Sequence, residues 1–461
     1  MALDSPHRSP TPMLTTDQIL RQDDHLIQSF ADLNALKQQG ARTVISRAEG
    51  PYVYDNDGTR MIDGIGGLWC VNIGHGREEI ITAIADQLRT LDYYSTFYNF
   101  THPKAAALAE KIAQLAPGHL NAVYFGNSGS VANDSAIRIL HHYNIRKGKP
   151  AKKLVLSRMG AYHGSTHLAI AMTTPLYSEG WHGATEIVHH LPSVHHWREG
   201  GTMTEAEFRD HLIADMRAQI ERIGPDKICA FIAEPIQGAG GVITAPSGYH
   251  RRAWEVCQDY DIKYVADEVV TAFGRLGHFF ASEDVFGMVP DIITTAKGLT
   301  SGYQPLSATI VSDDIQEVIT GPGGLFLHGM TYSGHPAAAA AGLANIALME
   351  AEVIPERVRT TGARFEANLR GLTDIDIVGE VRGSHFMMGI EFVRDKATKE
   401  TFAPEAEVGL KVAQACQRRG LIARPLGNVL ILSPTLIMDT PMIDDIAAIL
   451  RDAILEVAAG L

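Results

Sequence analysis

The sequence predicts an α/β protein with a mainly parallel sheet covered by helices on both faces, together with a second, smaller α+β domain. Amphipathic helical patterns alternate with short apolar runs, and strands separated by helices pair mainly in parallel. The length of 461 residues allows two large domains or one bipartite fold. Hydrophobic residues make up 45% and charged residues 20%, which is the balance of a folded, soluble protein.

The first expected element is a hairpin over residues 42–63, where the sequence alternates around the turn Asn56-Asp57-Gly58. It is expected to join the smaller domain. The helical patterns that follow cover residues 78–91, 104–115, 132–143 and 205–223. Apolar runs bounded by Gly, Pro or charge predict buried strands at 153–157, 228–233, 262–266, 292–295 and 306–311.

The pattern changes from about His335. The Ala-rich run 336–349 is shorter than the roughly 20 residues that cross a bilayer, so it predicts a packed helix. A strand at 386–392, a helix at 406–419 and a strand at 429–432 then suggest a separate α+β unit. We therefore expect a large domain over 76–334, with residues 1–75 and 335–461 forming the small one.

The net charge limits the partners that we expect, and the cysteine content indicates the cellular compartment. The net charge of −13 repels nucleic acid and anionic lipid, so neither is an expected partner. The four cysteines lie far apart without a disulfide pattern, which favours a reducing, cytoplasmic location. Residues 1–12 lack the apolar core of a signal peptide and are interpreted as a loose leader.

Chemically active residues follow three of the predicted strands, at the sheet edge where open parallel sheets bind ligands. Asp267 follows the run 262–266, and Lys297 follows the run 292–296. A third strand leads into Gly126-Asn127-Ser128-Gly129-Ser130 before a helix, where free N–H groups and the helix dipole suit a phosphate. This turn fits neither nucleotide-binding fingerprint, so the phosphate is expected to belong to another kind of cofactor.

Burying a charged lysine at the end of a strand costs free energy, unless its amine is neutral or is covalently bonded, as in a Schiff base. Pyridoxal phosphate needs a lysine for its aldehyde, an acid that keeps its pyridine nitrogen protonated, and a phosphate site. Lys297, Asp267 and the turn at 126–130 supply these three parts. Pyridoxal 5'-phosphate is therefore the expected cofactor.

Six short motifs occur in a fixed order within residues 40–440. They are Ser128-Gly129-Ser130-Val131-Ala132-Asn133-Asp134, Tyr162-His163-Gly164, Glu234-Pro235-Ile236-Gln237-Gly238, Asp267-Glu268-Val269, Lys297-Gly298 and Met330-Thr331-Tyr332-Ser333-Gly334-His335. With them the sequence resembles the class III (omega) aminotransferases of pyridoxal-phosphate fold type I. The resemblance implies a seven-stranded, mainly parallel sheet, a small domain from both termini and a homodimer, with a tetramer left open.

The resemblance also implies roles for single residues. Lys297, Asp267 and Tyr162 would be catalytic: Lys297 carries the cofactor and moves a proton, Asp267 pairs with the pyridine nitrogen, and Tyr162 stacks on the ring opposite Val269. The other implied cofactor contacts are Ser128, Gly129, Ser130, Glu234 and Thr331. Thr331 would reach the phosphate of the neighbouring subunit, so the homodimer would share its two active sites.

Substrate residues are implied in the same way. The 4-aminobutyrate and ornithine branches have a glutamate that pairs with an active-site arginine, whereas this chain has Ala239 at that place. Arg424 matches the arginine that binds the pyruvate carboxylate in omega-amino-acid and amine:pyruvate transaminases. Leu68, Trp69 and, from the other subunit, Phe97 match the lining of the substrate pocket, and an aromatic wall favours an amine over a small dicarboxylate.

The expected reaction is ping-pong transfer of an amino group from a primary amine or omega-amino acid to pyruvate. Within the fold, the alternatives are a 4-aminobutyrate-like or diamine transaminase that uses 2-oxoglutarate, or an aminomutase. A catalytically silent binding protein is the rival from another class, and the intact Lys297, Asp267 and Tyr162 argue against it.

Three pairs of adjacent histidines, at 141–142, 189–190 and 195–196, suggest a metal site at first sight. They lack the spacing of zinc ligands, and the last two pairs flank Leu191-Pro192, interpreted as a loop. We expect structural or solvated histidines and no metal.

Overall fold

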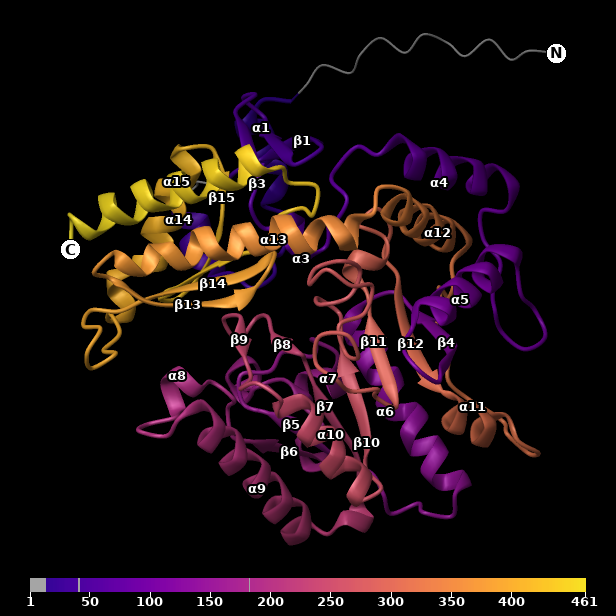
Figure 1. The fold of residues 1–461 in the computed structure, drawn as a ribbon. Helices are drawn as coiled ribbons and strands as arrows, with labels where there is room; N and C mark the ends of the chain where they lie inside the picture. Colours follow the sequence, from indigo (N-terminus) through magenta and orange to yellow (C-terminus); the bar gives the residue numbers. More distant parts are fainter. Residues whose placement is uncertain (1–13, 40–41, 182) are drawn as a thin grey trace, which may run out of the picture.

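A seven-stranded sheet forms the centre of the computed structural model, which describes residues 14–39, 42–181 and 183–461. The expected leader lies outside these residues. The strand order is β4-β12-β11-β10-β7-β5-β6 (Figure 1). Only β12 runs against its neighbours, so the prediction of a mainly parallel sheet is confirmed. The strands are β4 (Leu120–Gly126), β5 (Leu154–Arg158), β6 (Val188–Leu191), β7 (Ile228–Ala233), β10 (Lys263–Asp267), β11 (Ile292–Thr295) and β12 (Ser307–Ser312).

Alternate residues of the central strands pack into two separate cores. Phe231 and Tyr264 face one core, whereas their neighbours Ile232 and Val265 face the other. A sheet buried on both faces explains why these strands are continuous apolar runs in the sequence. One face is covered by α6 (Gly129–Arg146), α7 (His167–Met172) and α11 (Asp313–Thr320). The other is covered by α5 (Pro103–Leu115), α9 (Glu205–Ile223), α10 (Tyr249–Asp259) and α12 (Pro336–Ala351), with α4 (Glu78–Thr90) packed on α12.

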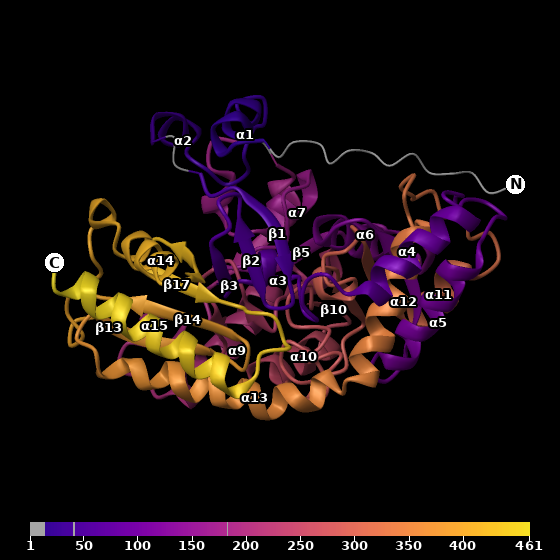
Figure 2. The ribbon, with the colours of Figure 1, turned by 90° about the horizontal axis from the view of Figure 1, so that it is seen from above.

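A second, four-stranded sheet with the order β13-β14-β17-β16 lies beside the central one (Figures 1 and 2). All its strand pairs are antiparallel, and helices cover one of its faces. Its strands are β13 (Val378–Ser384), β14 (Met387–Phe392), β16 (Arg424–Leu426) and β17 (Val429–Leu432). Its helices are α13 (Ile354–Arg370), α14 (Val408–Arg418) and α15 (Thr440–Ala458).

The two ends of the chain meet in a third sheet with the order β1-β2-β3-β15. The expected hairpin is confirmed as β2 (Tyr52–Asp55) and β3 (Arg60–Asp63), preceded by β1 (Ile45–Glu49). β3 pairs in parallel with β15 (Leu421–Ile422). The remaining α-helices and strands are α1 (Thr16–Asp23), α2 (Leu33–Gln39), α3 (Gly66–Trp69), α8 (His196–Glu199), and the hairpin of β8 (Ile236–Gln237) and β9 (Ile243–Thr244).

The interpretation of Leu191 as part of a loop was wrong, because Leu191 ends the edge strand β6 and pairs with Arg158, whereas Pro192 lies outside the strand. His189 and His190 are half-buried strand residues, and polar side chains at a sheet edge hide such a strand from a search for apolar runs. Among the described residues, no single helix is long and apolar enough to span a membrane. α12 and residues 354–374 meet that test only as a pair bent by 67°.

Candidate active site

A cavity of about 800 Å³ opens at the carboxyl ends of β4, β10 and β11. Its walls also include residues of α3, β16 and the segment at Ser29 and Phe30. The predicted site residues that line it are Leu68, Trp69, Ser128, Gly129, Ser130, Tyr162, Glu234, Ala239, Asp267, Val269, Lys297 and Arg424. The structure therefore brings together residues that lie up to 356 positions apart, from Leu68 to Arg424.

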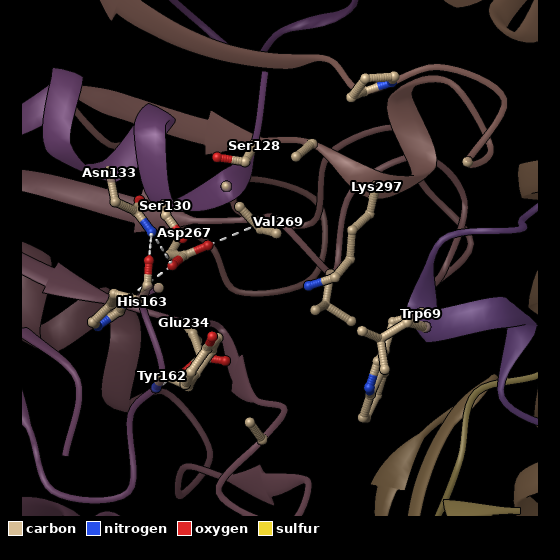
Figure 3. Close-up of a pocket in the computed structure, with 18 of the residues that line it drawn as sticks. Trp69, Ser128, Ser130, Asn133, Tyr162, His163, Glu234, Asp267, Val269 and Lys297 are labelled. Carbon is tan, nitrogen blue, oxygen red and sulfur yellow. Dashed lines mark hydrogen bonds and ion pairs between the residues drawn. The ribbon is translucent and has the colours of Figure 1, made fainter. Parts of the chain in front are cut away.

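Asp267 is the best-anchored charge in the cavity (Figure 3). Its Oδ2 accepts hydrogen bonds from Asn133 Nδ2 at 2.8 Å and pairs with His163 Nδ1 at 2.7 Å. Its Oδ1 accepts only the N–H of Val269, at 3.1 Å, which leaves one lone pair of this oxygen for a ligand. Thr294 on β11 donates to Asn133 Oδ1 at 2.7 Å and so fixes the amide. Asn133 and His163 thus orient the carboxylate, a role that their motif positions alone did not reveal.

Lys297 begins a short 3₁₀ turn, Lys297–Leu299, which is separated from β11 by Ala296 alone. Its φ of +39° places a lysine in the left-handed region, a strained conformation of the kind found at functional sites. Gly298 is required next, since a Cβ there would lie 2.4 Å from Asn72 Nδ2. Asn345 on α12 donates to the carbonyls of Gly298 and Leu299 and holds the turn. Burial lowers the pKa of the Lys297 amine, which favours the neutral, nucleophilic form.

The turn before α6 is built for close contact with an anion. Ser128 caps the helix, since its hydroxyl accepts the N–H of Val131, and the first N–H groups of a helix have no partner within it. Gly129 lies so near Val269 that a Cβ would approach it to 2.9 Å. Ser130 Oγ accepts the N–H of Ser165 at 3.1 Å, which ties this turn to the loop after β5.

Glu234 holds two walls of the cavity together. Its Oε1 accepts the N–H of Tyr162 at 2.8 Å, and its Oε2 accepts the N–H of Gly238 at 2.8 Å. Burial raises the pKa of this carboxyl to about 7, and the charge of Asp267 acts in the same direction, whereas His163 opposes it. The structure thus assigns Glu234 a positioning contact with Tyr162.

The raised pKa of Glu234 gives a testable pH dependence. Between its ordinary pKa of 4.5 and about 7, the folded protein holds a proton that the unfolded chain has released, so stability falls as the pH rises through this range, and the loss is complete above about pH 7. Glu234→Gln cannot ionise and escapes this cost. We expect the melting temperature of the cofactor-free variant, relative to wild type, to be higher at pH 8 than at pH 5. An equal difference at both pH values would contradict the raised pKa.

Trp69 and Leu68 line the cavity from α3. The buried Asp63 holds the backbone at the start of this helix. Asp63, at the end of β3, accepts the N–H groups of Ile65 and Gly67 and pairs with His75 Nε2 at 3.0 Å. Trp69 is 4% exposed and has a φ of +64°, so packing holds it in a strained conformation.

Two aromatic residues of the cavity were missed by the sequence analysis. The rings of Phe30 and Tyr177 lie 5.9 and 5.5 Å from that of Tyr162, each in an edge-to-face arrangement. Tyr177 also donates from its hydroxyl to the carbonyl of Ala239 at 3.2 Å. Neither residue belongs to a recognisable motif or follows a predicted strand, so no signal in the sequence marked it.

Phe97 and Thr331 are not among the residues that line the cavity of their own chain. They belong instead to one neighbouring surface. The Tyr93 hydroxyl donates to the carbonyl of Thr331 at 2.7 Å, and a Cβ at Gly329 would meet the Phe97 ring at 2.7 Å. Thr331 is exposed on this surface.

Comparison with known proteins places this site in a family. Residues 35–454 match the family model described as aminotransferase class-III. A putrescine–pyruvate aminotransferase of Pseudomonas aeruginosa is 41% identical, over 95% of this chain and 96% of its own length. A diaminobutyrate–2-oxoglutarate transaminase of Halomonas elongata is 39% identical, over 91% of both chains.

Solved structures agree with the sequence relatives. An (S)-enantioselective omega-transaminase from Thermomicrobium roseum superposes with a TM-score of 0.94 at 38% identity, covering 97% of this chain and 100% of the other. An omega transaminase from Pseudomonas jessenii, solved in complex with PMP, gives a TM-score of 0.92 at 33% identity, covering 96% and 98%.

The geometry of the cavity, independently of these comparisons, suits pyridoxal phosphate, the cofactor of this family. It holds a strained, half-buried lysine, an anchored carboxylate with a free lone pair and a helix N-terminus whose glycine packs against Val269. The chain therefore belongs to the class III aminotransferases and is a pyridoxal-phosphate-dependent enzyme of fold type I.

Proposed function

We propose that this aminotransferase moves an amino group from a primary amine or omega-amino acid to pyruvate by a ping-pong mechanism. The proposal rests on the position of Arg424 in the cavity and on its lack of a partner in the described part of the chain. Its guanidinium lines the cavity without a hydrogen bond or ion pair to any described residue. An unpaired guanidinium in a pocket that also presents Phe30, Trp69 and Tyr162 suits a monocarboxylate that binds in one half of the cycle and leaves in the other.

The surroundings of Arg424 support the same acceptor. Ala239 supplies no acid, and the nearby Tyr177 hydroxyl donates to the Ala239 carbonyl. Asp267 and Glu234 are the acids of the cavity lining, and both are already held by N–H donors. Trp69, Phe30 and Tyr162 give the remaining walls an apolar character, which suits the carbon chain of an amine.

For the cofactor, we propose that Lys297 binds its aldehyde and Asp267 its pyridine nitrogen. Val269 and Tyr162 would pack on its ring, while Ser128, Gly129 and Ser130 would hold its phosphate. When bound, pyridoxal phosphate supplies an electron sink that stabilises the charge left on the substrate carbon. The Lys297 amine, once free, would move the proton from the substrate carbon to the cofactor carbon C4′, and its lowered pKa favours the basic form needed for this step.

We further propose a homodimer in which Phe97 and Thr331 complete the partner's cavity. The surface that carries both residues exposes large apolar side chains, including Tyr98 at 98%, Leu327 at 78% and Leu325 at 71%. Large apolar side chains exposed to this extent near one surface are typical of an interface. Both residues lie outside the cavity of their own chain, which agrees with a role in the other one.

The acceptor is tested by a visible spectrum of the purified protein. Addition of a primary amine should bleach the band of the lysine-bound cofactor, and addition of pyruvate should restore it. Restoration by 2-oxoglutarate alone would favour the second candidate, a diamine or 4-aminobutyrate type of transaminase. That candidate is favoured by the 39% identical relative named for 2-oxoglutarate.

The role of Arg424 has its own test. Arg424→Met removes the guanidinium and should raise the KM for pyruvate about 10- to 100-fold, the loss expected for one charge-assisted bidentate contact. The rate of the first half-reaction, in which an amine without a carboxylate bleaches the cofactor band, should change less than about twofold. An unchanged KM would show that the acceptor carboxylate binds elsewhere.

A further inference from the structure

A row of four residues crosses the small antiparallel sheet and ends in two arginines. The register places Arg424 opposite Ile431, Ile431 opposite Gly389, and Gly389 opposite Arg382. Residues directly opposite each other in an antiparallel sheet point to the same face, so both arginines leave the sheet on one side. Three strand spacings separate them by about 14 Å.

The turn Gly238–Gly241, which carries Ala239, packs onto this row between the two arginines. Arg382 is 4% exposed, and its Nε donates to the carbonyl of Gly241 at 2.8 Å. Beside it, a Cβ on Gly389 would lie 2.9 Å from the Gly241 carbonyl oxygen, so only glycine lets the turn approach this closely. Arg424 lies beyond, where it and Ala239 line the cavity.

Arg382 is itself held by a buried ion network. Glu380 and Glu391 face each other across β13 and β14, a like-charge pair that is unfavourable without cations. Arg382 Nη1 bonds both carboxylates, Arg198 Nε donates to Glu391 at 2.8 Å, and His195 Nε2 lies 2.8 Å from Glu380. His195, Glu380 and Glu391 offer ligand atoms within 4.8 Å of one another, but the two arginines already neutralise this group.

We propose that Arg382 is a positioning residue for the acceptor carboxylate: it fixes the Gly238–Gly241 turn on the small sheet and thereby sets the place of Ala239 relative to Arg424. Because Arg424 stands in the same row, one rigid sheet positions both sides of the carboxylate site. The inference rests on the proposed function in taking a keto acid as the ligand of Arg424.

A substitution can remove the hydrogen bond from Arg382 to Gly241 and keep the positive charge at this position. Arg382→Lys keeps a cation between Glu380 and Glu391 but loses the second donor that reaches Gly241. We expect the holoenzyme of this variant to melt within a few degrees of wild type, with the KM for pyruvate raised about tenfold, the loss expected for one hydrogen bond to a charged group. The rate of bleaching by a primary amine should change less than about twofold.

A second variant tests the same geometry without touching a charge. Gly389→Ala places a methyl group against the Gly241 carbonyl and must displace the turn, so it should also raise the KM for pyruvate by about tenfold. Calorimetric affinity for propionate, a carboxylate without a keto group, should fall in parallel in both variants. The matched control is Arg394→Met, which removes an exposed arginine paired with Glu400 and should leave both values unchanged.

The outcomes separate this inference from the proposed acceptor. If wild type accepts 2-oxoglutarate and not pyruvate, the proposed acceptor is wrong, and the same KM comparison is made with 2-oxoglutarate. If Arg382→Lys keeps the wild-type KM for the keto acid that wild type uses, the positioning role is refuted. An equal fall in the amine half-reaction and in acceptor affinity would also refute it, because it would show a general loss of structure.

Discussion

Replacing Lys297 by alanine is expected to lower turnover at least about 10⁴-fold, the upper end of what one positioned acid–base group contributes. Lys297 is the only lysine in the cavity lining of the described residues, and its strained turn is held by Asn345 rather than by its own side chain. The variant should therefore fold. The measurement is steady-state turnover of a primary amine and pyruvate, together with the visible spectrum of the variant supplied with pyridoxal phosphate.

The control for this change is Lys153→Ala, which removes an exposed lysine just before β5. Its turnover should match wild type. Retention of more than about a hundredth of the wild-type turnover by Lys297→Ala would mean that another group carries the proton.

The second large effect is expected from Asp267→Asn. The change keeps the size of the side chain but removes its charge, and it turns one oxygen into a donor that faces Asn133 Nδ2, His163 or the Val269 N–H. Removal of a preorganised group of this kind costs about 10²- to 10³-fold in rate. We expect a fall of that size in the bleaching of the cofactor band by amine, measured in a single turnover.

Asp452→Asn provides the matched loss of a negative charge, because Asp452 is exposed on α15 and outside the cavity lining. It should leave the single-turnover rate unchanged. An Asp267→Asn variant as fast as Asp452→Asn would remove Asp267 from the catalytic machinery.

The sequence predicted the strands that appear as apolar runs and missed strands that carry polar residues, and it also left out the helices α13 and α15. The strands β7, β10 and β11 are buried on both faces and appear as apolar runs, which is why their positions were confirmed almost residue for residue. β13 and β6 carry polar residues, and β13 holds charged pairs that are satisfied only in three dimensions. Such strands cannot be recognised from apolar periodicity alone.

The residues of the candidate site also fall into two groups, those that the sequence pattern located and those that it missed. Lys297 and Asp267 could be found because they end buried strands, and the edge of the sheet brings them together. Phe30 comes from a segment that no pattern connects to the cavity, and Arg382 acts through the carbonyl of Gly241, a contact that depends on backbone register. The contacts of Phe30 and Arg382 follow from the packing of segments that lie far apart in the sequence, and they leave no local signal in it.

Reduction of the purified holoenzyme with borohydride, followed by digestion and mass spectrometry, makes the link between cofactor and protein permanent and locates it. The proposed mechanism predicts that the added pyridoxyl mass is found on the peptide that contains Lys297, and that prior addition of an amine prevents the labelling. Label on a peptide without Lys297, or no label on any peptide, would contradict it.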